Sequence, residues 1–364
     1  MRKKKILLFT FIFLLCSAQS AWAAYHFSSF RGRSPIHIFR ADVVPRGISP
    51  DTIKTIYHFP KSGGNGTIAI IGAYDDTTIE KDLQVFSQMF GLPECSSKNG
   101  CFEKHPIGNK KIASNSGWNL ETSLDVEWAH AIAPGAKILL VQAPTPSGAN
   151  LLAAVDYAAG RSDAVAISMS WGGREFEEEK SLDAHFVSKS GAVFFASSGD
   201  NGWGASWPAS SPNVVSVGGT SLLLKDDGSF KSEKAWEGSG GGVSAYEPQP
   251  SYQSSYSIPK AKGKRAIPDV SYNADPHSGF SVYAKGTWYV LGGTSAGAPQ
   301  WAGIRSLGLS AANEKFYSDK ASNSHATFFR DITGGSNGDC AYYCDARKRY
   351  DYITGLGSPL TINF

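Results

Sequence analysis

The chain has 364 residues, of which 35 are lysine or arginine and 32 are aspartate or glutamate, and its formal net charge is +3 at pH 7. Residues 1–23 contain four of the basic residues and no acidic one, so the rest of the chain is nearly neutral. This balance excludes the strongly basic character that is typical of nucleic-acid-binding proteins.

The chain begins with a pattern typical of a secretory signal peptide. A basic start at 2–5 precedes an apolar run at 6–16, and Ala21-Trp22-Ala23 matches a cleavage site. Because the apolar run is too short to span a bilayer, we expect removal of residues 1–23, secretion or export to the periplasm, and no membrane attachment afterwards. Residues 24–47 then form an N-terminal tail that is too short for a folded domain.

Apolar runs alternate with amphipathic stretches throughout residues 48–364, with no linker between them. The apolar runs predict strands at 67–74, 137–144, 164–171, 192–199 and 214–221. The amphipathic stretches predict helices at 77–89, 121–132, 149–160, 178–189 and 295–311. Since the strands are apolar throughout, as in a parallel sheet covered on both faces, we expect one α/β domain with a mostly parallel central sheet flanked by helices.

Cysteine spacing indicates two short disulfide loops. Once the signal peptide is removed, Cys95 and Cys101 form one close pair and Cys340 and Cys344 another. Two local disulfides are the simplest interpretation in an exported protein, and no His or Cys repeats at a spacing typical of zinc ligands.

The segment around residue 265 mixes surface and core signals. Lys260, Lys262, Lys264 and Arg265 form a small basic loop, which we interpret as a solvated surface. Asp269, in Pro268-Asp269-Val270, is interpreted instead as a buried, hydrogen-bonded core residue.

One predicted helix carries a pair of carboxylates. Glu121 and Asp125 are four residues apart, so their side chains share one face of the helix that ends before Pro134. Two carboxylates this close resist ionising together and form a coupled acid/base pair. A solvated acidic face is the alternative. His130 lies off that face and is interpreted as a structural or rim residue.

A serine follows a strand and a glycine pair near the C-terminus. In Gly293-Thr294-Ser295 the serine stands at the start of a predicted helix, where its hydroxyl can attack a carbonyl and backbone amides can face the developing charge. Asp200 follows the predicted strand 192–199, at the carboxyl edge where parallel sheets place their chemistry. A protonated aspartate there can donate a hydrogen bond to an oxyanion, although most such strings are ordinary turns.

Taken together, these strings resemble the sedolisins, the serine-carboxyl peptidases that share the subtilisin fold. The matching strings occur in the family's order and lie at Glu121…Asp125-Val126-Glu127-Trp128-Ala129, Ser168-Met169-Ser170-Trp171-Gly172, Ser197-Ser198-Gly199-Asp200, Gly293-Thr294-Ser295, Phe329-Arg330-Asp331-Ile332-Thr333 and Thr354-Gly355-Leu356-Gly357. The resemblance covers residues 48–364. It implies that Ser295 is the nucleophile, Glu121 its general base, Asp125 the partner of Glu121, and Asp200 the oxyanion-hole acid. It also implies that Ser170–Gly173 is an edge that pairs with the substrate backbone.

The same resemblance implies one calcium ion in a loop at 329–357. Asp331 and Asp351 would supply carboxylates, and Ile332, Arg347 and Arg349 would supply backbone carbonyls. The two arginines depart from the family, which usually has glycines at these positions. Arginine tolerates fewer backbone angles than glycine and adds positive charge beside a cation.

The expected function is that of a secreted, acid-acting serine-carboxyl endopeptidase that cleaves protein or peptide substrates through an acyl-enzyme, as a monomer. Because Asp200 must be protonated to donate, the activity optimum is expected below about pH 5. Two alternatives remain open: a neutral subtilisin-type hydrolase with His130 as base, and an exported binding protein on an altered peptidase fold.

Overall fold

A computed structural model of the chain describes residues 26–308, 311–318 and 328–360, so the expected signal peptide at 1–23 lies outside the described residues. The α-helices are α1 (Pro50–Ile56), α2 (Ile79–Phe90), α3 (Ser116–Ile132), α4 (Gly148–Ala159), α5 (Ser251–Tyr256), α6 (Gly297–Ser306) and α7 (Asn313–Ser318). Short 3-10 helices lie at η1 (Phe27–Ser29), η2 (Glu177–Phe186), η3 (Pro276–Ser278), η4 (Thr294–Ala296) and η5 (Ala341–Tyr343).

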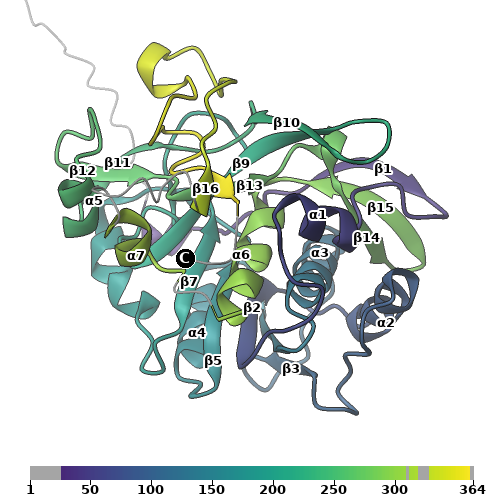
Figure 1. Cartoon of the computed structure of the whole chain (residues 1–364). Helices are drawn as coiled ribbons and strands as arrows, with labels where there is room; N and C mark the ends of the chain where they lie inside the picture. The colour runs from purple at the N-terminus through teal and green to yellow at the C-terminus, as the bar shows by residue number, and fades with distance from the viewer. Residues whose placement is uncertain (1–25, 309–310, 319–327, 361–364) are drawn as a thin grey trace, which may run out of the picture.

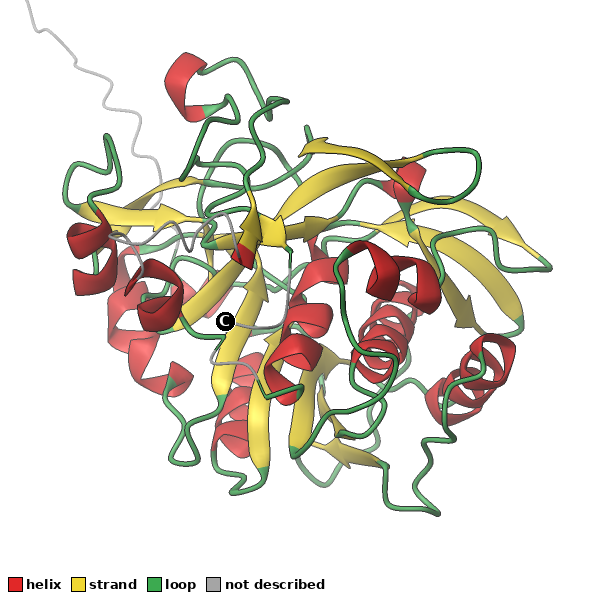
Figure 2. Cartoon of the chain, viewed as in Figure 1, coloured by secondary structure: helices red, strands yellow, loops and turns green. Residues whose placement is uncertain are grey.

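The central sheet has eight strands and is mostly parallel (Figures 1 and 2). Its strands are β2 (Thr67–Ala73), β3 (Phe102–Pro106), β4 (Lys137–Ala143), β5 (Ala164–Met169), β7 (Val193–Ser197), β9 (Val214–Leu224), β10 (Phe230–Ala235) and β13 (Val270–Asn273). The order is β10-β9-β7-β5-β2-β4-β3, β13 also pairs with β9, and β10 alone runs antiparallel. The α/β fold with a parallel central sheet is therefore confirmed.

Smaller sheets surround this one. Strand β1 (His37–Asp42) pairs antiparallel with β15 (Thr287–Gly292), which also pairs with β14 (Phe280–Ala284). The remaining short strands are β6 (Gly173–Arg174), β8 (Ser206–Trp207), β11 (Gly242–Pro248), β12 (Lys264–Ile267), β16 (Phe329–Arg330) and β17 (Ser358–Pro359). The N-terminal segment is thus joined to the strand that leads into Ser295.

Both faces of the central sheet are buried, as the uniformly apolar strands predict. Side chains alternate along β2: Ile68 and Ile70 pack in the core beneath α3 and α6, whereas Ala69 and Ile71 pack in a second core beneath α4. Helices α3 and α6 also pack on each other. Residues on α3 and in the turn that leads into α6 are therefore held between the sheet and a neighbouring helix.

Among the predicted elements, one helix is wrong in type. The segment expected as a helix at 178–189 is the 3-10 helix η2. Phe176, which precedes the helix, and Glu179 and Leu182 within it face inward. They recur every three positions, which is the period of a 3-10 helix. The helix expected at 295–311 begins as η4 and continues as α6 only to Ser306.

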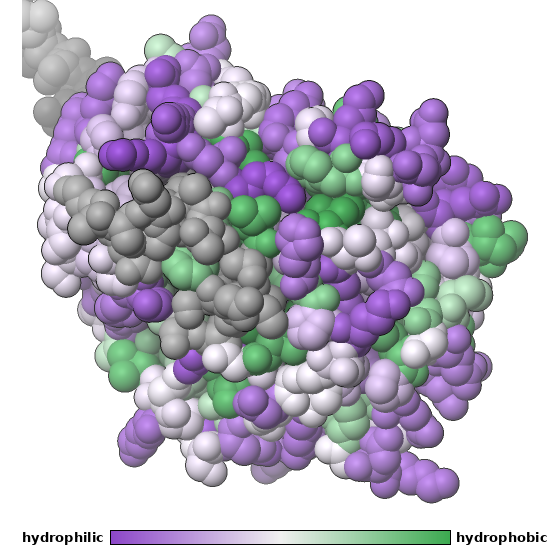
Figure 3. Space-filling model, viewed as in Figure 1, coloured by the Kyte–Doolittle hydropathy of each residue, from purple (hydrophilic) through white to green (hydrophobic). Residues whose placement is uncertain are grey.

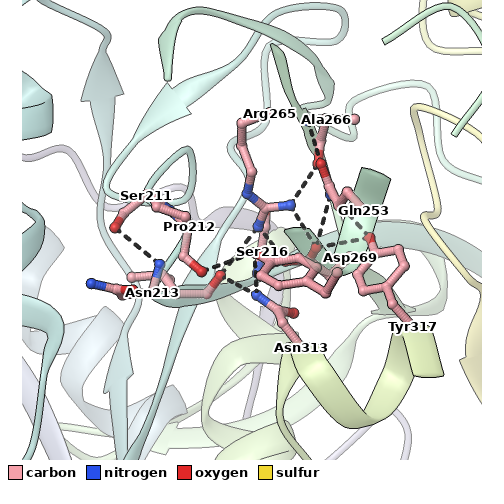
Figure 4. A network of polar contacts seen from close by, with 12 residues as sticks. Ser211, Pro212, Asn213, Ser216, Gln253, Arg265, Ala266, Asp269, Asn313 and Tyr317 are labelled. Carbon is pink, nitrogen blue, oxygen red and sulfur yellow. Dashed lines mark hydrogen bonds and ion pairs between the residues drawn. The ribbon is translucent and has the colours of Figure 1, made fainter. Parts of the chain in front are cut away.

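The interpretation of the basic loop is wrong at Arg265. This side chain is fully buried and forms two hydrogen bonds to Asp269, at 2.6 and 2.5 Å (Figure 4). Tyr317 donates to the same carboxylate at 2.8 Å, as does the backbone N–H of Ser216. The prediction that Asp269 is a buried, hydrogen-bonded core residue is confirmed.

Both expected disulfides, Cys95–Cys101 and Cys340–Cys344, are present. No helix in the described part of the chain is both long and apolar enough to cross a lipid bilayer. On the face seen in Figure 3, hydrophobic residues form small groups among hydrophilic ones.

Candidate active site

Ser295 stands in the tight connection between β15 and α6. It lies in the 3-10 turn η4 and is fully buried. Its hydroxyl makes no hydrogen bond of good geometry to a described residue, but it lies near enough to the Glu121 carboxyl to lower the pKa of that group. Gly293, just before this turn, has φ of 123°, and a Cβ there would lie 2.6 Å from Asp200 Oδ2. Only glycine fits this position, because a side chain would strain the backbone and collide with the carboxylate.

Glu121 and Asp125 lie on α3. The Asn115 side chain caps this helix by accepting hydrogen bonds from the backbone N–H groups of Gly117 and Trp118. Both carboxyl groups are buried, at 2% and 1% exposure. Ser170, just beyond β5, donates its hydroxyl to Asp125 Oδ1 at 2.7 Å and lies 3.3 Å from the Ser295 carbonyl oxygen. The Ser170 hydroxyl at the end of β5 therefore connects α3 with the turn that contains Ser295. The alternative of a solvated acidic face is wrong.

Burial without a neutralising cation controls the protonation of this pair. Burial raises the pKa of Glu121 to about 8, although hydrogen bonding to Ser34 opposes the rise. Burial, followed by the nearby charge of Glu121, raises the pKa of Asp125 well above its usual range. The pair therefore holds a proton at neutral pH, and Glu121 keeps one buried oxygen, Oε1, free of hydrogen bonds from described residues.

Asp200 follows β7 and its side chain is only 4% exposed. The backbone N–H and the hydroxyl of Thr294 both donate to Asp200 Oδ1, at 2.9 and 2.7 Å. Oδ2 therefore faces Gly293 on the side of the serine. Burial raises the pKa of Asp200, so its protonated form persists to higher pH than that of an exposed aspartate.

The structure brings Glu121, Asp125, Asp200 and Ser295 together at one edge of the sheet. Four contacting residues were missed by sequence reasoning: Ser34, His37, Ser170 and Thr294. Ser170 and Thr294 lie within the quoted strings and could have been found there, whereas no local pattern identifies the two tail residues.

His130 lies elsewhere. It is fully buried, its Nε2 is 2.9 Å from the Pro93 carbonyl oxygen, and it neighbours the Cys95–Cys101 disulfide. Its interpretation as structural is supported, but it is a core residue and not a rim residue. Burial lowers its pKa and favours the neutral ring.

Comparison with known proteins agrees with this arrangement. Residues 109–328 match the model of the subtilase family, a span that contains all four candidate catalytic residues. Sedolisin from Pseudomonas sp. (strain 101) is 30% identical over 86% of this chain and 60% of its own length. Kumamolisin from Bacillus sp. (strain MN-32) is 31% identical over 87% of this chain and 63% of its own length.

The chain belongs to the subtilase family, among the sedolisins. A solved structure of Pseudomonas sedolisin, described as a serine-carboxyl proteinase complexed with two molecules of pseudo-iodotyrostatin, superposes with a TM-score of 0.74 at 28% identity. That match covers 87% of this chain and 96% of the solved one. The chain spans about three fifths of the length of the curated sedolisin relatives.

The loop at 329–357, where calcium is expected, contains several oxygen atoms that could act as metal ligands. Asp351 is 2% exposed and accepts hydrogen bonds from the backbone N–H groups of Arg347 and Thr354, at 3.1 and 2.8 Å. Asp331 accepts from the backbone N–H of Arg349, which adopts a left-handed φ of 69°. Neither aspartate forms an ion pair with any described residue. Two carboxylates without a cationic partner, one of them buried, suit a calcium ion.

Proposed function

We propose that this protein is an exported serine-carboxyl endopeptidase in which Ser295, Glu121, Asp125 and Asp200 perform the chemistry. The observation that carries the proposal is the convergence of three buried carboxyl groups and one buried serine at one sheet edge. Membership of the sedolisins supports it.

In the proposed reaction, Glu121 accepts the Ser295 proton while the serine oxygen attacks the peptide carbonyl. Before the attack, Asp125 holds one proton, so the pair carries a single negative charge; accepting the serine proton makes the pair neutral. The oxyanion receives hydrogen bonds from protonated Asp200 and from the Ser295 backbone N–H. The amine leaves with a proton from the Glu121 pair, and water then hydrolyses the acyl-enzyme.

Acid conditions favour this chemistry because Asp200 can donate only when protonated. Activity is therefore expected to fall as the pH rises through the pKa of Asp200. Since burial raises that pKa, the high-pH limb lies above the value for an exposed aspartate.

We also propose that the loop at 329–357 binds one calcium ion through the Asp331 and Asp351 carboxylates. The backbone carbonyls of Ile332, Arg347 and Arg349 would complete the set. A bound calcium ion would neutralise the buried carboxylate and fix the loop beside the core.

Cleavage of an unfolded protein between pH 2 and 8 tests the function, with Ser295→Ala as the matched variant. Acid-limited cleavage that disappears in the variant would support the proposal. Equal activity of the two proteins would contradict it.

His130→Ala tests the alternative of a neutral hydrolase, in which His130 is the base. We expect this variant to retain cleavage, because the imidazole lies beside a disulfide loop and not at the serine. A protein that binds peptides tightly but cleaves none at any pH would favour the binding-protein alternative.

A further inference from the structure

The N-terminal segment Phe30–His37 crosses the candidate active site as an extended strand. Gly32 donates its backbone N–H to the Pro146 carbonyl at 2.8 Å. Arg33 exchanges two backbone hydrogen bonds with Gly172, at 2.9 and 3.1 Å. The segment therefore lies between two edges, and one of them is the edge expected to pair with substrate backbone.

Beyond this pairing, the segment reaches the oxyanion side of the site. The position that a Cβ on Gly293 would occupy is in contact with both the Pro35 carbonyl oxygen and Asp200 Oδ2. A peptide carbonyl of the chain itself thus lies beside the candidate oxyanion acid, as a substrate carbonyl would.

Two side chains of the segment engage the catalytic carboxyl groups. The Ser34 hydroxyl donates to Glu121 Oε2 in a short hydrogen bond. His37 Nε2 lies 3.1 Å from Asp200 Oδ2. In this arrangement Ser34 shares the Glu121 carboxyl with Ser295, and His37 contacts the Asp200 oxygen that would serve the oxyanion.

An aromatic anchor holds the start of the segment. The Phe30 ring is fully buried, 4.8 Å from the Trp207 ring and 5.8 Å from the Phe176 ring, in edge-to-face and tilted arrangements. By contrast, Pro35 has no N–H to offer where an antiparallel strand would next donate, two residues beyond Arg33. The segment is therefore anchored at its start by the Phe30 ring and at its end by the pairing of His37 with Gly292, and it is held less tightly between them.

We propose that residues 30–37 form an intramolecular inhibitor that occupies the substrate-binding cleft and competes with substrate. The proposal rests on the proposed function, since it takes Ser295, Glu121 and Asp200 as the reacting groups.

Gly32→Leu in the full chain tests this inference. A Cβ at Gly32 would lie 2.6 Å from Leu151 Cδ1, so the larger side chain should displace the segment while leaving the catalytic residues unchanged. The apparent KM for a peptide substrate should fall by about tenfold or more with kcat unchanged, since about 1.4 kcal/mol of segment binding corresponds to a factor of ten. Ser28→Leu, at an exposed tail position, is the size-matched control and should behave as wild type.

A binding measurement separates this inference from the proposed function. A synthetic peptide of residues 28–38 should bind Gly32→Leu in a Ser295→Ala background, measured by calorimetry, and should not bind Ser295→Ala alone. If no protein cleaves substrate but this binding difference is seen, the peptidase proposal fails and the segment is still the occupant of the cleft. If cleavage is seen but the KM of Gly32→Leu equals that of wild type and the peptide does not bind, the inhibitor proposal is contradicted and the peptidase proposal is not. Phe30→Ala, which removes the anchor, replaces Gly32→Leu if that variant does not fold.

Discussion

Buried carboxyl groups occur in two opposite environments in this molecule. Asp269 and Arg265 are both fully buried, and the carboxylate is fully hydrogen-bonded by the guanidinium, a tyrosine hydroxyl and a backbone N–H (Figure 4). Glu121, Asp125 and Asp200 are almost as deeply buried, but no lysine or arginine is paired with them among the described residues. The core carboxylate is neutralised by its partner, whereas burial raises the pKa values of the site carboxyls.

The presence or absence of a cationic partner separates carboxyl groups that stabilise the fold from those that can exchange protons. A neutralised pair has no proton to exchange, so it can only hold elements together. Carboxyl groups without a cation have raised pKa values and can give and take protons near the working pH, at a cost in stability. Substitution of a site carboxyl should therefore lower activity more than stability, and substitution of the core carboxylate should lower stability more than activity.

The largest effect is expected from Glu121→Gln. Without a proton acceptor for Ser295, kcat should fall by at least about 1,000-fold, as for other catalytic triads. The free energy of unfolding at pH 7 should not fall, because the amide has no charge to desolvate. Rates with a peptide substrate and a urea unfolding curve give the two quantities, and a large loss of stability would contradict the comparison.

Asp269→Asn should have the reverse consequence. Removing the charge leaves Arg265 buried without its counter-ion, which costs about 3–5 kcal/mol of unfolding free energy. The fraction that stays folded should keep a kcat close to wild type, because Asp269 does not contact the reacting groups. Asp226→Asn, at an exposed loop position, is the control and should leave stability unchanged.

A bound calcium ion should give Asp351 the cationic partner that it lacks. At a hundred times its Kd, calcium should stabilise the protein by about 2.7 kcal/mol, and a chelator should lower Tm correspondingly. Asp351→Asn should remove most of this response. A Tm that is the same with calcium and with chelator would contradict the proposed calcium site.

A further effect is expected in the pH dependence of stability. The pKa of Glu121 is about 8 in the folded state and is close to 4.3 in an unfolded chain. Between these values the folded Glu121–Asp125 pair holds a proton that the unfolded chain has released, so the free energy of unfolding should fall as the pH rises from about 4 to 8. Glu121→Gln should reduce this slope in denaturation curves, and a slope equal to that of wild type would show that Glu121 is not the group responsible.

Sequence reasoning succeeded where the information is local. The uniformly apolar runs located β2, β4, β5, β7 and β9 to within a few residues, and four-residue spacing placed Glu121 and Asp125 on one helix face. It failed where tertiary contacts decide. Arg265 in a lysine-rich loop gives no local sign that Asp269 draws it into the core.

The same limit applies to the candidate site. The strings around Glu121, Asp200 and Ser295 are recognisable because their chemistry depends on residues next to them in the chain. Ser34 and His37 contact these groups only because the tail folds back along β15, and that register comes from pairing between distant strands. Such long-range pairing has no signature within the tail.

The position of α6 has a consequence for how the protein is made. Ser170 and Ser295 meet although they are 125 positions apart, and α6 must dock between α3 and the sheet for this contact to form. During synthesis, the segments that carry Glu121 and Asp200 leave the ribosome well before the serine does. The growing chain therefore cannot assemble the candidate site until its last quarter is in place.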